Sequence, residues 1–344
     1  VPISDWDTSL IVDMSNLFKD ETTFNDNING WDTSNVSNMN SLFASAISFD
    51  QPLNNWNTSN VTDMRYMFSG YIENGVIIYS SFNKSLNEWD VSNVKNMSNM
   101  FMMSIFNQNI DNWDVSNVKF MNWMFHHSSI TLLSSWDVSN VIEMGGMFHS
   151  AKKFNGDISS WNTTNVTSMD GLFANTNEFN QNISGWDTSN VIYMSGVFDS
   201  ADKFNQNISS WDTSNVSNMF RMFNNATSFN QPLNNWDTSN VSNMSYMFNN
   251  AENFNQNLSN FTFESLNPVD SMINMLNSSG INVSNYNDIL NDWSNKSPPN
   301  DVNFTANNLK YSLLGVPGRN KLINNYAWEI TNDKFQPQDK TELK

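Results

Sequence analysis

A row of acidic residues recurs at nearly constant spacing, and it is the first place where this sequence could do chemistry. Each member follows a tryptophan; the row consists of Asp7, Asp32, Asn57, Asp90, Asp114, Asp137, Asn162, Asp187, Asp212 and Asp237. Neighbouring carboxylates about 5 Å apart repel by roughly 0.8 kcal/mol in water, so something must offset that repulsion. Either each carboxylate accepts hydrogen bonds from the backbone of the following turn, or calcium bridges successive side chains. No EF-hand spacing accompanies the row.

The three histidines form a second candidate site. They are His126, His127 and His149, and His126 and His149 occupy the same position of two adjacent repeats. Stacking of those repeats would place the two side chains about 5 Å apart, where a metal could bridge them. No third ligand is evident, because Met102 and Ala174 fill the matching positions. The alternative is that these are surface histidines without a ligand.

Enzyme motifs are absent from the sequence. There is no cysteine, no G-x-S-x-G motif and no glycine-rich phosphate loop. We therefore predict a protein that is not an enzyme and has no cofactor, apart from the calcium considered above. The net charge is −18, from 34 acidic and 16 basic residues, which disfavours nucleic acid and anionic lipid as partners. The sequence contains no apolar run of about 18 residues, so we predict no membrane-spanning segment.

The acidic row belongs to a longer repeated phrase, W-D-[TV]-S-N-V-x-x-M-x-x-[ML]-F. Its anchors are Trp6, Trp31, Trp56, Trp89, Trp113, Trp136, Trp161, Trp186, Trp211 and Trp236, with Phe261 as a degenerate eleventh. Most intervals are 25 residues long, and a fixed period in this range is typical of a solenoid whose repeats bury their apolar faces against their neighbours. The sequence therefore predicts one elongated repeat domain.

The repeat at residues 183–207 shows the expected local structure. Residues 183–188 follow the leucine-rich-repeat strand pattern L-x-x-L-x-L, with Trp186 and Thr188 pointing inward and Asp187 outward on a concave face. Apolar residues from Val191 then recur at helical spacing, and a polar return follows. We predict an α/β solenoid of leucine-rich-repeat-like coils, each with one short parallel strand and one short helix. A second polar row in the returns, from Asn25 to Asn255, is expected to form a structural amide ladder.

One repeat carries an insertion that predicts a hairpin at residues 70–79. Asn74-Gly75 lies between two β-rich runs, which is a strong indication of a two-residue hairpin turn. The hairpin would carry six large side chains: Tyr71, Ile72, Val76, Ile77, Ile78 and Tyr79. Either it folds down over the edge of the solenoid, or it offers these side chains to a partner as an exposed patch. We therefore place the candidate partner-binding residues here.

The C-terminal region departs from the repeat. We assign residues 1–260 to about ten repeats, residues 261–333 to a degenerate repeat and a cap that covers the last coil, and residues 334–344 to a tail or linker. Within the cap, residues 286–293 and 320–326 are expected to be helices, residues 315–318 a turn and residues 326–331 a strand. Because no polar cap is visible near Val1, we also expect the natural protein to extend upstream.

The repeat phrase, with its continuation Ala-x-x-Phe-Asn-Gln, resembles that of BspA-like leucine-rich-repeat proteins of bacteria. Related repeats occur in mycoplasma lipoproteins and in protist and viral proteins, and the resemblance extends from Ile3 to about Asn260. The pattern around Tyr286, Trp293, Tyr311 and Trp328 resembles a terminal module found behind such repeats in Bacteroidetes.

The resemblance implies a secreted or surface-displayed binding protein, often adhesive, with no family-wide catalytic site. We therefore expect a protein or glycan partner on another cell or within the surface layer. The alternative is a structural spacer, a stalk or a viral surface component that holds no ligand on its concave face.

Overall fold

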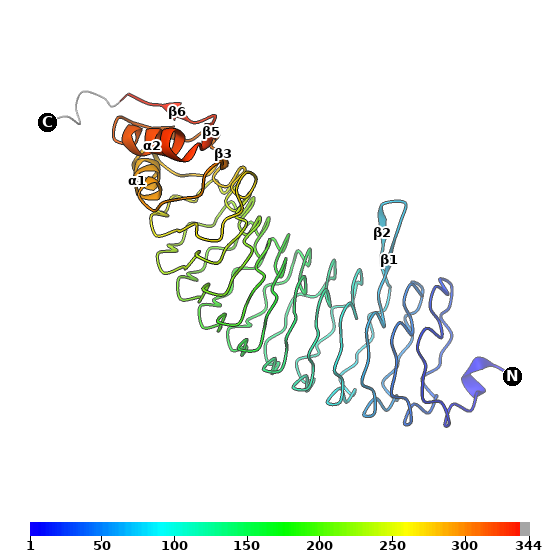
Figure 1. The fold of residues 1–344 in the computed structure, drawn as a ribbon. Coiled ribbons are helices and arrows are strands. Elements are labelled where there is room, and N and C mark those ends of the chain that lie inside the picture. Colours follow the sequence, from blue (N-terminus) through cyan, green and yellow to red (C-terminus); the bar gives the residue numbers. More distant parts are fainter. Residues whose placement is uncertain (338–344) are drawn as a thin grey trace. The chain divides into compact units, whose positions relative to one another are not determined.

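The computed structural model describes residues 1–337 (Figure 1). These residues form two compact units. The first unit holds residues 1–166 and 175–181, and the second holds residues 167–174 together with the chain from Asn182 onward. The first unit begins with a short 3-10 helix, η1 (Ile3–Asp5). In both units successive repeats pair side by side through isolated parallel bridges, such as Asn38 with Asp63 and Asn218 with Asn243.

The pairing is made by an eight-residue turn segment in each repeat, residues 39–46 in the second repeat. There, every second backbone N–H donates to a carbonyl of the next repeat, while the intervening N–H groups donate three residues back, as Leu42 does to Met39 at 3.2 Å. The donors and acceptors between the second and third repeats are Met39 with Asp63, Ser41 with Arg65, Phe43 with Met67 and Ser45 with Ser69, at 2.7–3.0 Å. Local and inter-repeat hydrogen bonds thus alternate, which leaves few buried backbone groups unpaired. We call the surface formed by these segments the turn face.

The short helix predicted in each repeat is not formed. Ser41 and Ser45 have positive φ angles of 57° and 61°, and nearly all equivalent residues of the other repeats share this left-handed conformation. An α-helix requires right-handed φ angles throughout and N–H groups that all donate four residues back. Here half of the N–H groups donate to the neighbouring repeat instead, so the segment is a succession of turns.

The short strand predicted at each Trp-Asp-Thr phrase is also absent. At this edge side chains, not backbone groups, connect the repeats: Trp56 Nε1 donates to the Ile28 carbonyl at 3.1 Å, and Thr33 Oγ1 to the Asn57 carbonyl at 2.9 Å. The parallel bridges are made instead by residues that directly precede the turn segment, such as Asn38 and Asp63. The threonine or valine of this phrase was correctly placed in the core, and where it is threonine its hydroxyl also donates to a carbonyl of the next repeat.

Columns of identical side chains fill the core, as the repeat phrase predicts. Trp31 stacks on Trp56 at 6.5 Å between ring centroids and 4° between planes, and Phe43 stacks on Phe68 at 5.6 Å. Met39, Met64 and the methionines of later repeats are fully buried. The return row is confirmed as an amide ladder, because Asn205 Oδ1 accepts the backbone N–H of Asn230 at 2.9 Å. Within each unit, successive repeats are therefore bonded along their turn segments, at their tryptophans and along their returns.

A β-hairpin stands out from the turns of the first unit (Figure 1). Strands β1 (Tyr71–Glu73) and β2 (Val76–Ile78) are antiparallel, with Tyr71 opposite Ile78 and Glu73 opposite Val76. Asn74 and Gly75 join them with φ angles of 50° and 80°, as a type I′ turn requires. The insertion thus forms a hairpin where the sequence indicates one.

The second unit ends in two helices and two small parallel sheets. Helices α1 (Val283–Ser294) and α2 (Val316–Tyr326) pack together, β3 (Asn303–Thr305) pairs with β5 (Glu329–Thr331), and β4 (Lys310–Tyr311) pairs with β6 (Lys334–Phe335). Trp293 Nε1 donates to the Leu258 carbonyl at 3.0 Å, as the tryptophans of the repeats do to their predecessors. Helix α1 therefore completes that ladder. No helix in the described chain is both long enough and apolar enough to cross a membrane.

Three expectations for the C-terminal region need adjustment. Residues 315–318 do not form a separate turn, because α2 already begins at Val316 and Pro317 suits its first turn. The final strand begins at Glu329 instead of Tyr326, which ends α2. The first two residues of the expected tail form β6, so the ordered chain extends at least that far. The rest of the tail, residues 338–344, lies outside the described residues.

Candidate functional site

The turn face holds residues in a backbone conformation that most side chains avoid. The third residue of each turn segment has φ between 55° and 62°, and these residues are Asn16, Ser41, Tyr66, Asn99, Trp123, Gly146, Gly171, Gly196, Arg221, Tyr246 and Asn274. A left-handed conformation costs roughly 1–2 kcal/mol for a residue with a Cβ, and least for Gly and Asn. Glycine, asparagine or serine occupies most of these positions. The large side chains are therefore the exceptions that need an explanation.

Two of these exceptions lie near each other in the first unit. Tyr66 and Trp123 are 40 % and 39 % exposed, so burial does not repay their conformation in full. Strained residues of this kind gather at functional sites, where they are kept for what the side chain does. In the second unit the equivalent Arg221 and Tyr246 contact each other, with the guanidinium 5.3 Å from the ring centroid. The first-unit pair is left facing solvent.

An open groove of about 380 Å³ lies between Tyr66 and Trp123. We call it the aromatic groove, and its walls and floor include Arg65, Tyr66, Ser98, Asn99, Trp123 and Glu143. Its volume falls within the range of about 300–1,000 Å³ that is typical of small-molecule sites. Two aromatic rings and several polar side chains thus converge on one surface of the first unit.

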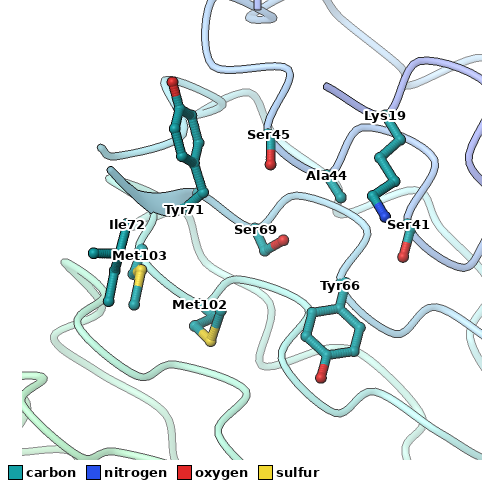
Figure 2. Close-up of a pocket in the computed structure, with 11 residues that line it drawn as sticks. Lys19, Ser41, Ala44, Ser45, Tyr66, Ser69, Tyr71, Ile72, Met102 and Met103 are labelled. Atoms are coloured by element: carbon teal, nitrogen blue, oxygen red, sulfur yellow. The ribbon is translucent and has the colours of Figure 1, made fainter. Parts of the chain in front are cut away.

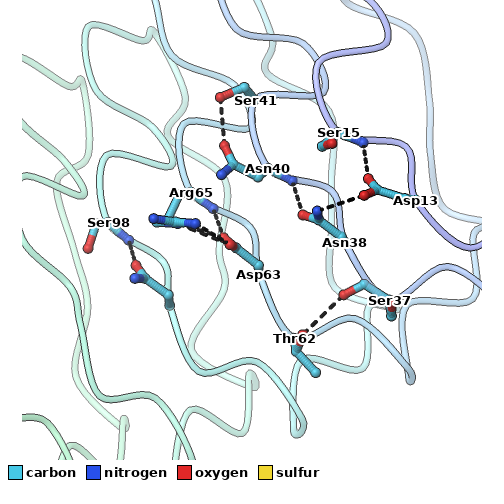
Figure 3. Close-up of polar contacts among 11 residues, drawn as sticks. Asp13, Ser15, Ser37, Asn38, Asn40, Ser41, Thr62, Asp63, Arg65 and Ser98 are labelled. Atoms are coloured by element: carbon cyan, nitrogen blue, oxygen red, sulfur yellow. Dashed lines mark hydrogen bonds and ion pairs between the residues drawn. The ribbon is translucent and has the colours of Figure 1, made fainter.

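The charged groups of the aromatic groove are already paired. Figure 3 shows Arg65 against Asp63, with Nη2 2.7 Å from Oδ2 and Nε 3.0 Å from Oδ1. This hydrogen bonding raises the pKa of Arg65 above its usual value. At the other end, Glu143 Oε2 accepts a hydrogen bond from Asn122 Nδ2 at 2.7 Å. The groove is therefore polar, with Arg65 neutralised by Asp63 and the charge of Glu143 left in place.

Two further cavities flank the hairpin. The first, of about 450 Å³, is lined by Tyr71 and Ile72 together with Tyr66, Met102 and Met103 (Figure 2). A second cavity, of about 470 Å³, is lined by the other hairpin strand and by the repeats that follow. Its side chains include Ile77, Tyr79, Ile105, His127, Lys152 and Lys153. The fold thus brings together the two interruptions of the repeat, the hairpin and the histidine-bearing turns.

The hairpin exposes much of its apolar surface. Ile72, Val76 and Tyr79 are 58 %, 60 % and 43 % exposed, while Tyr71, Ile77 and Ile78 are half-buried. Of the two arrangements considered from the sequence, the structure has the projecting one, since Ile72 and Val76 would be covered if the hairpin lay over the repeats. These six residues remain candidates for partner contact.

The histidines form an aromatic cluster with Trp123. The ring centroids of His126 and His149 are 4.8 Å apart, and that of Trp123 is 4.9 Å from His126 and 5.3 Å from His149. His126 Nδ1 lies 3.1 Å from the His149 carbonyl, and because a carbonyl only accepts, this nitrogen carries the proton. Burial, with His149 and His127 nearby, lowers the pKa of His126 to about 4. The pair predicted as a possible metal site is therefore adjacent and neutral at pH 7. Among the described residues no group of three or more potential ligands gathers around a common point.

The acidic row caps its own turns. Oδ1 of each member accepts the backbone N–H two residues on, at 2.9 Å for Asp32 with Ser34 and 3.0 Å for Asp187 with Ser189. The same bond is made by Asp7, Asp90, Asp114, Asp137, Asp212 and Asp237, and by the two asparagines of the row. Hydrogen bonds from Ser92 lower the pKa of Asp90 and those from Ser139 lower that of Asp137. The hydrogen-bond interpretation is confirmed, and the carboxylates stay exposed.

Sequence reasoning missed the aromatic groove. Tyr66 and Trp123 occupy a variable position of the phrase, outside the apolar positions from which the helix was predicted. The informative observation was available in most of the other repeats, where Asn, Gly or Ser fills that position. Such residues indicate a positive φ, and a large aromatic residue there is out of place.

Paired repeats of this kind define a repeat protein. In its first unit, the turn face carries a hairpin and an aromatic groove that the regular repeats lack. The chain belongs to the family described as "Mycoplasma protein of unknown function, DUF285", whose model matches residues 1–75, 76–131, 130–192 and 177–293. No curated protein and no solved structure matches the chain.

Proposed function

We propose that this is a non-enzymatic binding protein, displayed at the cell surface or secreted, that attaches to a partner on another cell or in the surface layer. Its binding face is the turn face of the first unit, from the hairpin to Trp123. The observation that supports this is the projecting hairpin, with Ile72 and Val76 more than half exposed between two cavities. Contiguous exposed apolar side chains of this kind are typical of interaction sites.

The regular repeats serve as the scaffold in this proposal. We infer a solenoid related to the leucine-rich-repeat class and to BspA-like surface proteins, with turn segments in place of the expected helices. The C-terminal region, similar to a Bacteroidetes module, would cap its last coil. Adhesion then depends on the few repeats that depart from the phrase.

A spacer or stalk is the second candidate function. The uniform acidic row favours it, because each side chain of that row is engaged in its own turn, as Asp137 is with Ser139 at 3.0 Å. A scaffold that binds no ligand would need the acidic row only for these hydrogen bonds within its turns. The two candidates differ in whether the hairpin matters.

Binding of the labelled intact chain to a panel of cell surfaces, with calcium and with chelator, tests the proposal. The variant Ile72→Ser/Val76→Ser/Tyr79→Ser should lose at least about tenfold in affinity, since exposed anchors of an interface carry most of its binding energy. A matched control replaces three exposed apolar residues elsewhere, Leu132, Ile192 and Tyr193, by serine. Absence of binding to every surface, or equal binding by the hairpin variant, would favour the spacer. Binding that requires calcium would revive the bridging role of the acidic row.

A further inference from the structure

We propose that the aromatic groove binds a neutral sugar unit of a glycan. This inference rests on the proposed function, since it names the ligand class for part of the same face. Tyr66 and Trp123 form its two ends and Asn99, in the repeat between them, lies in its floor.

The spacing of the two rings suits a sugar. Their repeats are two apart, and paired backbones lie about 4.8 Å from each other, so the two anchoring residues are about 10 Å apart along the turn face. A pyranose has an apolar C–H face that packs on an aromatic ring and a rim of hydroxyl groups that needs donors and acceptors. The groove offers aromatic surface at both ends and polar groups between them.

The floor holds two polar side chains that no other side chain or backbone group of the described chain engages. Ser98 and Asn99 are only 8 % and 9 % exposed, and within the described chain neither the Ser98 hydroxyl nor the Asn99 amide makes a side-chain hydrogen bond. Both residues line the groove. Their polar atoms are not among the buried unpaired atoms of the described chain, so they reach solvent in the groove and can donate to and accept from a polar ligand. Sugar hydroxyl groups can donate to and accept from both.

Charge selects a neutral ligand. Arg65 is neutralised by Asp63, Glu143 adds a negative charge, and the chain as a whole carries −18. Acidic sugars and nucleic acids would meet this field without a free cation in the groove to offset it. A peptide remains a competing occupant. The polar floor and the neutralised charge of Arg65 favour hydroxyl groups over a peptide's charged side chains.

The strain at Tyr66 and Trp123 provides a clean experiment. Asparagine occupies the same position at Asn16 and Asn99, with φ of 59° and 61°, so Tyr66→Asn and Trp123→Asn install a residue that this backbone already accepts. Tyr193→Asn is the matched control, because Tyr193 is 48 % exposed and lies outside the groove. Circular dichroism and the melting temperature establish that each variant is folded. If Trp123→Asn does not fold, Tyr66→Asn alone is sufficient for the test.

The intact chain is first applied to an array of neutral glycans, and any glycan retained is titrated calorimetrically. We expect Kd to rise by at least about tenfold in Tyr66→Asn and Trp123→Asn and to stay unchanged in Tyr193→Asn. Retention of no neutral glycan, while cell binding persists and depends on the hairpin, overturns the sugar site alone. Glycan binding that both groove variants keep also overturns it, as does a peptide ligand that Tyr66→Asn abolishes. Absence of any cell binding contradicts the proposed function itself.

Discussion

The indole ring of Trp123 lies directly over the backbone of Gly146 in the next repeat. A Cβ atom added to Gly146 would sit 2.5 Å from Cδ2 and Cε3 of that ring, a separation that real Cβ atoms do not reach. The glycine thus makes room for the tryptophan that closes one end of the aromatic groove. The two residues form one feature of the site, although they belong to different repeats.

Gly146→Ala should therefore destabilise the protein more than Gly196→Ala. Both glycines have left-handed φ angles, 62° and 60°, but a Cβ at Gly196 meets only the Asp199 Cβ at 3.7 Å. Both substitutions incur about 1–2 kcal/mol of backbone strain, and Gly146→Ala adds about 1–3 kcal/mol of overpacking. Urea unfolding of the two variants measures the difference, and equal losses would show that Trp123 moves away at no cost.

Trp211→Phe should cost about 2–3 kcal/mol of unfolding free energy. The indole N–H donates to the Ile183 carbonyl at 3.0 Å in the buried core. Phenylalanine removes this donor from the carbonyl, and its smaller ring leaves a cavity where the indole was. Thr213→Val is the comparison: its hydroxyl bonds to the Asp237 carbonyl at 2.8 Å, yet valine fills this position at Val115. We expect about 1 kcal/mol for Thr213→Val. A larger loss for valine than for phenylalanine would contradict this ranking.

Asp137 should be replaceable by asparagine but not by alanine. Asparagine keeps the oxygen that accepts from the Ser139 N–H, and Asn57 and Asn162 already make this turn. Alanine loses the acceptor at a cost of about 1 kcal/mol, as at a helix N-cap.

Acidification should separate Asp137→Asn from the parent chain. Hydrogen bonds from the Ser139 hydroxyl and N–H lower the pKa of Asp137 below its ordinary 3.8, so its contribution is present above that value and is lost as the pH falls further. Asp137→Asn removes this pH dependence. Parallel unfolding curves for the two proteins down to pH 3 would contradict it.

His126 should make the protein less stable as the pH falls from about 6.5 towards 4. Its folded pKa of about 4 lies below its ordinary 6.5, so the unfolded chain binds the proton first in that window. His149, His127 and Lys152 surround the site with groups that are or become positive, which opposes protonation further. Full stability is expected above pH 6.5.

His126→Asn is the variant for this test, because Asn224 holds the equivalent position. Its unfolding free energy should change less between pH 6.5 and 4 than that of the parent chain, as followed by urea unfolding at a series of pH values. An identical slope in both proteins would locate the acid sensitivity elsewhere.

The sequence predicted the register of the repeats and the core but not the backbone between them. Apolar residues at offsets of three and four, such as Met39, Leu42 and Phe43, suit a helix and also suit this spiral of turns. What separates the two is the residue with positive φ every fourth position, and the serines at 41 and 45 give little indication of it. The backbone bonds between repeats also join residues more than 20 positions apart, which no local pattern shows.

The candidate site was predicted in part. The Asn74-Gly75 pair fixes a hairpin through local turn chemistry, so its position could be inferred. The aromatic groove instead needs Tyr66 and Trp123 to meet across a third repeat, and only the pairing of turn segments shows that they do. The cavity shared by Ile77 and His127 has the same origin.

The alternating hydrogen bonds of the turn segments have a genetic consequence. Within each unit every pair of repeats closes the same set of bonds, so the number of repeats is not itself encoded in any contact. Unequal crossing-over between two near-identical copies would add or remove a whole 25-residue block and leave every remaining bond with a partner. Such recombination would lengthen or shorten the regular array on either side of the hairpin without a single point mutation. A lineage could in this way change the length of the scaffold that carries its contact residues by copy number alone.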